Sequence, residues 1–314
     1  GDALKNVSGY FNNRTEESVY DEAYLRGFNT DTRQYIDGMK DAPQSHSMAN
    51  IERIEVLKGP AGALYGRLEP GGLINYVTKR PLDKSYYSLQ QQFGSFDTYR
   101  TLGDATGRIT QDGSLLYRFT MEYLGANSYI DVVRKERGFV APSLTWKISP
   151  RTQLDLDFRY NDVNSPTSFG LPAVGNRPAR VPINRFMGEK STDDGDSNLL
   201  YGGITLKHEF SDNWNLDAKV AYNYENQWSK GTFIDTLDES TGDASRFYSS
   251  YNYSEDSIQG TVNLNGKLKT FGLDHMLTFG GDLFKFDGRN RGGYFLCQAC
   301  GTSYPSSINI YQPI

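Results

Sequence analysis

The feature that most constrains the fold is a repeated two-residue alternation of apolar and polar side chains. From Ser85 onward it recurs in stretches of about 9 to 11 residues, the length that a tilted strand needs to cross a bilayer. Residues 115–124 form the clearest stretch, in which strand geometry puts successive side chains on opposite faces. The apolar face carries Leu115, Tyr117, Phe119, Met121 and Tyr123, and the polar face carries Arg118, Thr120 and Glu122. One face therefore suits lipid and the other suits water.

Similar stretches predict about nine strands in all. Clear copies lie at 154–160 and 216–225, weaker copies lie at 87–93, 140–148, 204–210, 258–268 and 277–283, and a Gly-rich strand is expected near 102–109. The expected connections alternate, with short turns at 110–114, 149–152, 211–214 and 270–274 and mostly long, polar segments between them. Short turns at one end and long loops at the other are typical of an outer-membrane barrel.

A membrane-spanning helix is excluded, because no run approaches the roughly 18 consecutive apolar residues that it requires. Such a chain can meet a bilayer only as a closed antiparallel barrel. The alternative is a soluble β-sandwich or propeller, whose strands also alternate. Strands of soluble sheets average about 5 to 6 residues, and a soluble protein has no reason to sort its turns by length. The pattern favours the membrane barrel and leaves the soluble sheet open.

Residues 1–82 lack the long alternation and are expected to form a separate domain. Short apolar stretches such as residues 51–57 stand between Gly and Pro residues, as in Lys58-Gly59-Pro60 and Pro70-Gly71-Gly72. This pattern indicates a small mixed α/β domain. Pro81 and Leu82 mark a boundary, so the expected domains are residues 1–82 and residues 83–314.

Charge and cysteine content exclude several classes of function. The net charge of −5 argues against a nucleic-acid partner, which requires clustered Lys and Arg. Cys297 and Cys300 lack the further Cys or His ligands of a zinc site nearby, and a small loop disulfide is the preferred interpretation. We find no nucleophile elbow and no phosphate-binding Gly loop, so the protein is not expected to be an enzyme.

Five blocks in the first 82 residues resemble the plug domain of TonB-dependent siderophore receptors, above all the ferrichrome, ferrioxamine and pyoverdine receptor group. In order, they are Tyr24-Leu25-Arg26-Gly27-Phe28, Tyr35-Ile36-Asp37-Gly38, Ile51-Glu52-Arg53-Ile54-Glu55-Val56-Leu57-Lys58-Gly59-Pro60, Ala63-Leu64-Tyr65-Gly66 and Pro70-Gly71-Gly72-Leu73-Ile74-Asn75-Tyr76-Val77-Thr78-Lys79-Arg80-Pro81. The resemblance continues more loosely to residue 313. It implies a 22-stranded membrane β-barrel whose lumen is closed by an N-terminal α/β plug, of which this chain would be a fragment truncated at both ends.

The resemblance also implies a function. Such a receptor binds a ferric siderophore, here expected to be of the hydroxamate type, and imports it through the bacterial outer membrane into the periplasm. Its expected partners are the siderophore, the TonB–ExbB–ExbD energy-coupling complex, and outer-membrane lipid and lipopolysaccharide. No cofactor is expected, because iron arrives within the ligand. The alternatives are a passive porin, which needs no plug, and a related receptor for cobalamin or a catecholate chelate.

Candidate ligand-binding residues follow from the same resemblance. Arg26 matches a plug arginine that donates to siderophore oxygens, although it could instead pair with Glu22 or Asp37. Gln44 matches a polar position in the plug's apex loop at residues 41–48, which is shorter than in ferrichrome receptors and offers His46 and Met48 instead of aromatics. The barrel loops add three aromatic residues, for which the alternative is an aromatic girdle at the bilayer surface. They are Phe169, Trp228 and Phe233.

A second set of residues is expected to hold the plug in the barrel. Arg53 and Glu55 lie in the third block, and plug arginines of this block pair with carboxylates on the barrel wall in the family. Most of their partners would lie on strands beyond this chain.

Overall fold

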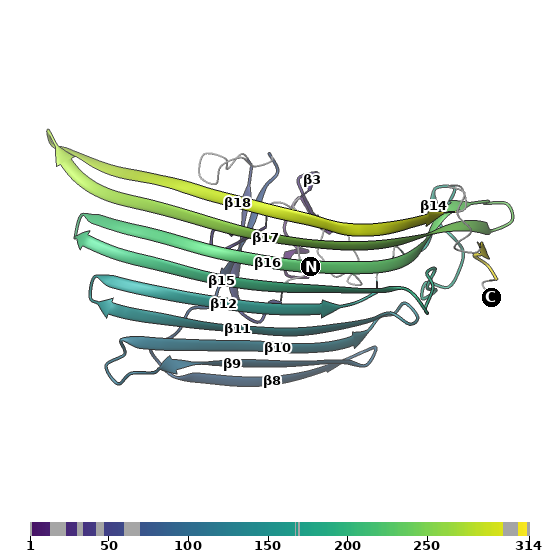
Figure 1. Cartoon of the computed structure of the whole chain (residues 1–314), viewed down its shortest axis with the longest axis horizontal. Helices are drawn as coiled ribbons and strands as arrows, with labels where there is room; N and C mark the ends of the chain where they lie inside the picture. Colours follow the sequence, from purple (N-terminus) through teal and green to yellow (C-terminus); the bar gives the residue numbers. More distant parts are fainter. Residues whose placement is uncertain are drawn as a thin grey trace.

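A single antiparallel sheet dominates the computed structural model, which describes residues 2–12, 23–29, 34–41, 47–59, 70–166, 168, 170–297 and 307–312 (Figure 1). Nine long strands in this part of the chain follow one another in sequence order. They are β8 (Tyr86–Gly94), β9 (Thr98–Arg108), β10 (Leu115–Asn127), β11 (Arg134–Ser149), β12 (Thr152–Asn164), β15 (Asp194–Ser211), β16 (Trp214–Leu237), β17 (Asp243–Thr270) and β18 (Leu273–Cys297). The meander is the expected piece of an antiparallel barrel.

The two faces of the sheet differ as the alternation predicts. On β10, Arg118, Thr120 and Glu122 are buried, whereas Phe119 and Tyr123 on the opposite face are about 40% exposed (39% and 45%). The large exposed apolar side chains continue across the other strands, for example Leu89, Trp146, Leu156, Val220, Val262 and Leu283. Nothing in the described residues covers this outer face, whereas a sandwich would bury it against a second sheet. The expectation of a lipid-facing barrel wall is therefore confirmed over the soluble alternative.

The connections at one end of the sheet are the predicted short turns. Strand bounds leave turns between Arg108 and Leu115, Ser149 and Thr152, Ser211 and Trp214, and Thr270 and Leu273. The other end carries connections of mixed length, from residues 95–97 to residues 165–193. Seven of the nine long strands in the described residues exceed the predicted length; the last four are the longest, and β17 reaches 28 residues. Since a tilted strand needs only about 9 to 11 residues to cross a bilayer, these strands extend past the membrane on the long-loop side.

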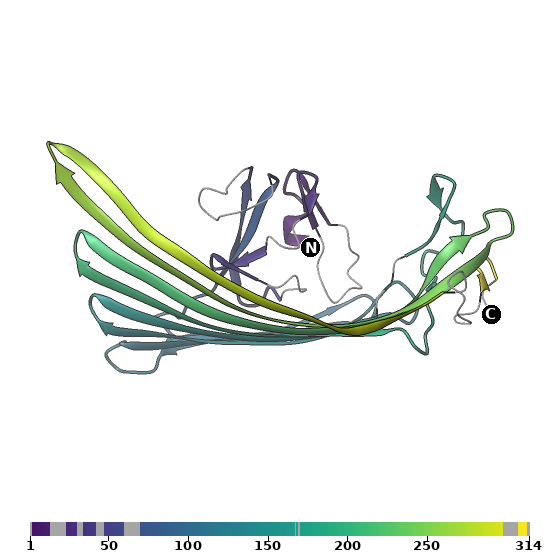
Figure 2. The same cartoon turned by 45° about the horizontal axis from the view of Figure 1, so that its top comes forward.

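The described residues between 2 and 80 pack against the concave side of the curved sheet, as Figure 2 shows. They form two small sheets. The first joins β1 (Tyr10–Asn12), β2 (Ala23–Leu25) and β3 (Phe28–Asn29), and the second joins β5 (Met39–Lys40), β4 (Gln34–Ile36), β7 (Gly72–Thr78) and β6 (Ile51–Lys58) in that spatial order. The pairing of β4 with β7 is parallel, and a short 3-10 helix, η1 (Asp2–Leu4), precedes them. This mixed domain is the predicted plug.

The plug has a small core of its own. Leu4, Ile36, Ile74 and Tyr76 are buried together, and Ile54 and Val56 of β6 pack against them. The Gly71-Gly72 pair of the fifth block lets backbones approach closely, because a Cβ at Gly71 would overlap the carbonyl oxygen of Leu25 and one at Gly72 that of Leu57.

Among the described residues, no helix is long and apolar enough to cross a membrane.

Candidate functional site

The hairpin of β4 and β5, residues 34–41, contacts the barrel wall at several points. At its turn, Asp37 accepts hydrogen bonds from the Thr78 backbone N and hydroxyl at 2.9 and 2.6 Å and an ion pair from Arg80 at 3.0 Å. Arg80 also binds both carboxylate oxygens of Asp157 on β12, at 3.0 and 2.9 Å. Burial alone would lower the pKa of Arg80, but Asp157 and Asp37 outweigh it and raise that pKa. Arg80 thus bridges a plug carboxylate and a barrel carboxylate.

Two further barrel strands hold the same hairpin by its backbone. The ammonium of Lys219 on β16 donates to the carbonyl oxygen of Asp37 at 3.1 Å. On β17, the amide of Gln259 accepts from the Lys40 backbone N at 3.0 Å and donates to the Lys40 carbonyl oxygen at 2.5 Å. The Gln259 side chain therefore pairs with the backbone N–H and C=O groups at the edge of β5, as a neighbouring strand would.

The end of the hairpin is fixed by a buried ion pair. Arg159 on β12 donates to both oxygens of Asp41 at 2.8 and 2.9 Å, and both side chains are at most 5% exposed. The Arg159 guanidinium also lies 4.9 Å from the ring centre of Tyr201. Tyr201 belongs to a buried apolar cluster in which the plug residue Met39 packs against Leu199 and Ala221 of the wall.

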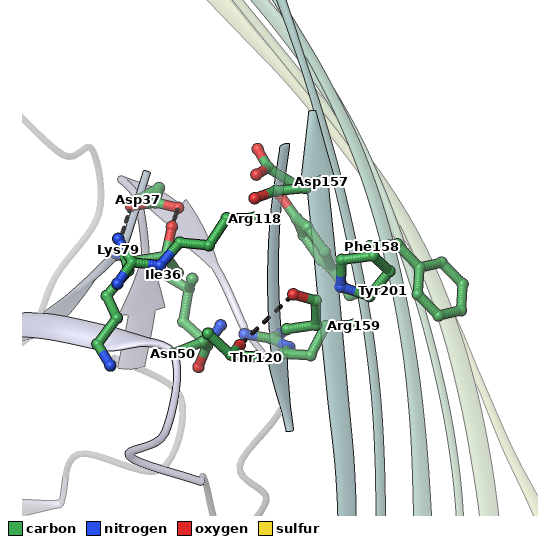
Figure 3. Close-up of a pocket in the computed structure, with 14 residues that line it drawn as sticks. Ile36, Asp37, Asn50, Lys79, Arg118, Thr120, Asp157, Phe158, Arg159 and Tyr201 are labelled. Atoms are coloured by element: carbon green, nitrogen blue, oxygen red, sulfur yellow. Dashed lines mark hydrogen bonds between the residues drawn. The ribbon is translucent and has the colours of Figure 1, made fainter. Parts of the chain in front are cut away.

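A second group of charges joins the domain boundary to β9 and β10. Asp104 on β9 accepts from Lys79 at 3.0 Å and from Arg118 at 2.9 and 2.7 Å, and Arg118 donates to the Arg80 carbonyl oxygen at 3.0 Å. Figure 3 shows the polar cavity between these groups and β12, with Asp37 and Lys79 on the plug side and Asp157 and Arg159 on the wall. Its volume of about 20 Å³ suffices for a single water molecule.

At the long-loop end, several connections pack into one assembly. The buried cluster there contains Ala179, Met187, Ala244 and Ile310, and the short strands β13 (Ala173–Val174), β14 (Arg177–Pro178) and β19 (Ile308–Asn309) lie around it. β19 pairs with the start of β17. Beside this cluster, a pocket of about 170 Å³ has mostly apolar and aromatic walls and a few hydroxyls. It is lined by Ser168, Gly170, Leu171, Pro172, Phe186, Met187, Gly188, Thr232, Phe233 and Ile234.

The structure separates the predicted ligand residues into different regions. Arg26 is exposed in the turn between β2 and β3, and the Asp37 carboxylate that it could have paired with is taken by Thr78 and Arg80. Phe233 lines the outer pocket, with its ring centre 5.3 Å from that of Phe247. Gln44, Phe169 and Glu22 lie outside the described residues.

Trp228 is placed differently from Phe233. On β16, Asn223 and Glu225 face the lumen and are buried, so Trp228 shares the outward face with Val220 and Tyr222. Lys230, on the same face, has its ammonium 5.4 Å from the Trp228 ring centre. This placement favours the girdle interpretation for Trp228.

Arg53 and Glu55 pair with each other within β6. The guanidinium of Arg53 lies 2.9 Å from Glu55, and Asn75 donates to the second oxygen of Glu55 at 2.9 Å. The hydrogen bond from Asn75, followed by that from Arg53, lowers the pKa of Glu55. Among the described residues, the hydrogen bonds and ion pairs of this pair all stay within the plug, so their role against the barrel stays a prediction. The Cys297 backbone ends β18, and Cys300 lies outside the described residues, so the disulfide also stays a prediction.

Sequence reasoning missed the residues that bind plug to wall. The predicted site residues did not include four of them: Asp41, Arg159, Lys219 and Gln259. The polar face of each strand was recognised, but which of its residues meets the plug depends on pairing between segments more than 100 residues apart.

Two family models match the chain. The TonB-dependent Receptor Plug Domain matches residues 1–73, and the TonB dependent receptor-like, beta-barrel model matches residues 142–311, more than half of the chain. Among curated relatives, the metal-pseudopaline receptor CntO of Pseudomonas aeruginosa is 30% identical over 281 residues, 88% of this chain and 38% of that receptor. The ferrioxamine B receptor of Salmonella typhimurium is 27% identical over 300 residues, 89% of this chain and 42% of that receptor.

Solved structures show the same fold. The ferric-catecholate import receptor Fiu of E. coli K12, in its open form, has a TM-score of 0.86 at 24% identity, covering all of this chain and 49% of that one. The pyoverdine receptor FpvA of Pseudomonas aeruginosa PAO1 has a TM-score of 0.83 at 21% identity, over 93% of this chain and 44% of that one. The chain spans less than half the length of the relatives it matches. Its plug, its partial barrel and both family matches show that the chain belongs to the TonB-dependent receptors.

Proposed function

We propose that the whole protein binds a siderophore or a similar metal chelate outside the cell and imports it through the bacterial outer membrane. The observation that carries this proposal is a folded plug fixed to a polar lumen wall whose opposite face is apolar and exposed. In this account the chelate passes unchanged, iron is cargo and the protein performs no catalytic step. The energy would come from the TonB–ExbB–ExbD complex, and the outer face would contact lipid and lipopolysaccharide.

Within this class, we propose a ferric hydroxamate as the ligand. The exposed guanidinium of Arg26 suits the oxygens around the metal, and the pocket beside Phe233 offers apolar walls and a few hydroxyls at the long-loop end. Gln44 and Phe169 are proposed to complete the site. The relatives are named for ferrioxamine B, for catecholates and for metal-pseudopaline, so all three chelate types belong in the test.

A passive porin is the competing function. A porin needs an open lumen, whereas here the plug is joined to β12, β16 and β17 through Arg80, Arg159, Lys219 and Gln259. A plug held by several buried contacts suits a gated receptor.

The test is equilibrium binding to the full-length receptor in detergent, followed by intrinsic tryptophan fluorescence. The panel contains ferrioxamine B, a ferric tris-catecholate and metal-loaded pseudopaline. The proposal predicts saturable binding of one chelate with a dissociation constant below about 1 μM, and weaker binding by Arg26→Ala. Binding of the catecholate or pseudopaline alone would reject the hydroxamate, and no binding together with steady ion conductance in a planar bilayer would reject the receptor.

A further inference from the structure

One wall of the outer pocket beside Phe233 is held in place by distant parts of the chain. This wall is residues 186–188, from the long connection between β12 and β15, and residues 232–234 of β16 form another part of the lining. The connection contains only the two-residue strands β13 and β14. The position of the wall therefore depends on its contacts with other segments.

The wall itself is tightly packed. A Cβ at Gly188 would overlap both the Asp193 carboxylate and the ring of Phe186, so only glycine leaves room for this arrangement. Met187, between them, is buried in the apolar cluster that contains Ile310. The position of the Phe186 ring thus follows that of the backbone at residues 187–188.

The start of the wall is joined to Ile310, which directly follows β19. The guanidinium of Arg185 donates to the Ile310 carbonyl oxygen, and Met187 packs in the same cluster as the Ile310 side chain. Ile310 is completely buried, and its backbone N donates to the carbonyl oxygen of Gly242 at 2.8 Å. Because hydrogen bonds from charged donors are among the stronger ones, Arg185 ties the wall firmly to a fixed point.

The end of the wall is joined to β17. The guanidinium of Arg246 is 5% exposed and lies 3.6 Å from the Glu189 carboxylate. The Glu189 backbone N donates to the Asp193 carboxylate at 2.7 Å, and its carbonyl oxygen accepts from the backbone N atoms of Thr192 and Asp193 at 3.0 and 2.9 Å. A three-residue wall fixed at both ends has little conformational entropy left to lose when a ligand binds.

We propose that Arg185 and Ile310 are positioning residues for ligand binding, which hold residues 186–188 in the arrangement that the chelate requires. The inference rests on the proposed function, because it takes the outer pocket to be part of the chelate site. Neither residue lines the pocket, so both act through the wall. They raise the fraction of molecules whose wall is in place, and the apparent dissociation constant rises as that fraction falls.

The test uses Arg185→Gln in the full-length receptor. This change removes the charge and shortens the side chain, whereas Arg185→Lys keeps a charged donor. Arg185→Gln should weaken binding of ferrioxamine B, or of whichever panel chelate the wild type binds, by about tenfold, and Arg185→Lys by less than about threefold. In stopped-flow tryptophan fluorescence the loss should lie in the association rate constant, because the chelate binds only molecules whose wall is in place.

Arg177→Gln is the matched control, because Arg177 is exposed on β14 in the same connection and does not line the pocket. It should change affinity by less than about twofold. Unchanged affinity in Arg185→Gln, an equal loss in Arg177→Gln, or a loss that lies only in the dissociation rate constant would overturn the proposal. Should Arg185→Gln fail to fold, Ile310→Val is a milder change at the other partner, with an expected loss of about threefold and the same criterion.

Gly188→Ala tests whether the pocket belongs to the site at all, because it displaces the wall directly. It should weaken binding by tenfold or more. Unchanged affinity would remove the pocket from the chelate site and overturn the inference, while binding of the chelate elsewhere in the receptor would stand.

Hydrogen exchange of the ligand-free protein separates the inference from the proposed function. The backbone amides of residues 189 and 310 are hydrogen-bonded and should exchange about tenfold faster in Arg185→Gln than in wild type or Arg177→Gln. The amides of β10 should not change. This result can be obtained for a receptor that binds nothing in the panel, which would reject the proposed function alone. Unchanged exchange at both residues would reject the inference even where the chelate binds.

Discussion

Glu225 on β16 lies directly opposite Glu255 on β17 in the antiparallel register. Glu225 is 2% exposed, and its carboxylate accepts from Ser197 at 3.3 Å. Glu255 accepts from the Tyr253 hydroxyl at 2.8 Å. Asp41 adds a third carboxylate close enough to act on both. Burial disfavours the ionised form of both carboxyls and their mutual approach disfavours it further, so this part of the lumen wall is less stable than its packing alone would make it.

Removing one of these charges should stabilise the protein. Glu225→Gln keeps an acceptor for Ser197 and replaces a buried carboxyl beside Glu255, which is costly to ionise there, with a neutral amide, so the free energy of unfolding should rise by about 0.2 to 1 kcal/mol at neutral pH. Thermal unfolding of the full-length protein in detergent measures it. Glu209→Gln, at an exposed position of β15, is the control and should change little. A lower thermal midpoint for Glu225→Gln would contradict this prediction and show that the Glu225 carboxyl stabilises the folded protein.

The amide of Gln259 should contribute to holding the plug. Gln259→Leu leaves the Lys40 backbone N and carbonyl oxygen without these partners, which costs about 1 to 3 kcal/mol for buried groups. Urea unfolding, monitored by hydrogen exchange of the backbone amides of residues 34–41, would detect this loss of stability. Gln92→Leu on β8 provides a control, because that side chain is exposed. Equal stability of the two variants would contradict the assignment.

Much of the wall could be predicted from the sequence, because the period of two is local information. Residues 115–124 identified both faces of β10, and the short turns followed from where the alternation stops. The site could be predicted less well. Asp155, Asp157 and Arg159 lie on the same face of β12 in the alternating pattern, yet each has a different partner. Arg159 binds Asp41, Asp157 binds Arg80, and Asp155 accepts from Thr145 on the neighbouring strand. Which partner each meets depends on how the plug is seated, which no local pattern contains.

Strand length was the other quantity that the pattern could not predict. The bilayer fixes only the alternating part of β16 and β17, whereas their extensions are held by loop packing around Ala244 and Ile310. That packing involves β19, which pairs with the start of β17 although the two are far apart in the sequence. Polar strand extensions carry no lipid-facing repeat that would reveal them.

The outward placement of Trp228 gives a prediction about the membrane. Trp228→Ala should change the affinity for a chelate by less than about twofold, because its side chain shares a face with Val220 and Tyr222. In proteoliposomes, brominated lipids should quench the fluorescence of wild type more than that of Trp228→Ala. A loss of affinity of tenfold or more in Trp228→Ala, with equal quenching of wild type and variant, would show instead that Trp228 contacts the ligand.

The turn between β9 and β10 should stay ordered in acid. Asp112 accepts from the Ser114 backbone N at 3.1 Å and hydroxyl at 2.8 Å, and hydrogen bonds from Thr110 and Ser114 lower the pKa of Asp112 to about 2. Because the folded pKa is below the unfolded value near 3.9, this contribution to stability is complete above that value and is lost as the pH falls through about 2. An NMR titration of selectively labelled receptor should give this midpoint, and a peptide of residues 110–114 should titrate near 3.9. Equal midpoints would contradict the hydrogen-bonded turn.

Uptake by whole cells distinguishes energy-dependent import from passive diffusion. Iron-starved bacteria producing the full-length receptor would be given the chelate that it binds, loaded with radioactive iron, with and without a functional TonB protein. We expect saturable accumulation of iron that requires both the receptor and TonB. Accumulation that rises linearly with chelate concentration and continues without TonB would contradict it and indicate a passive channel.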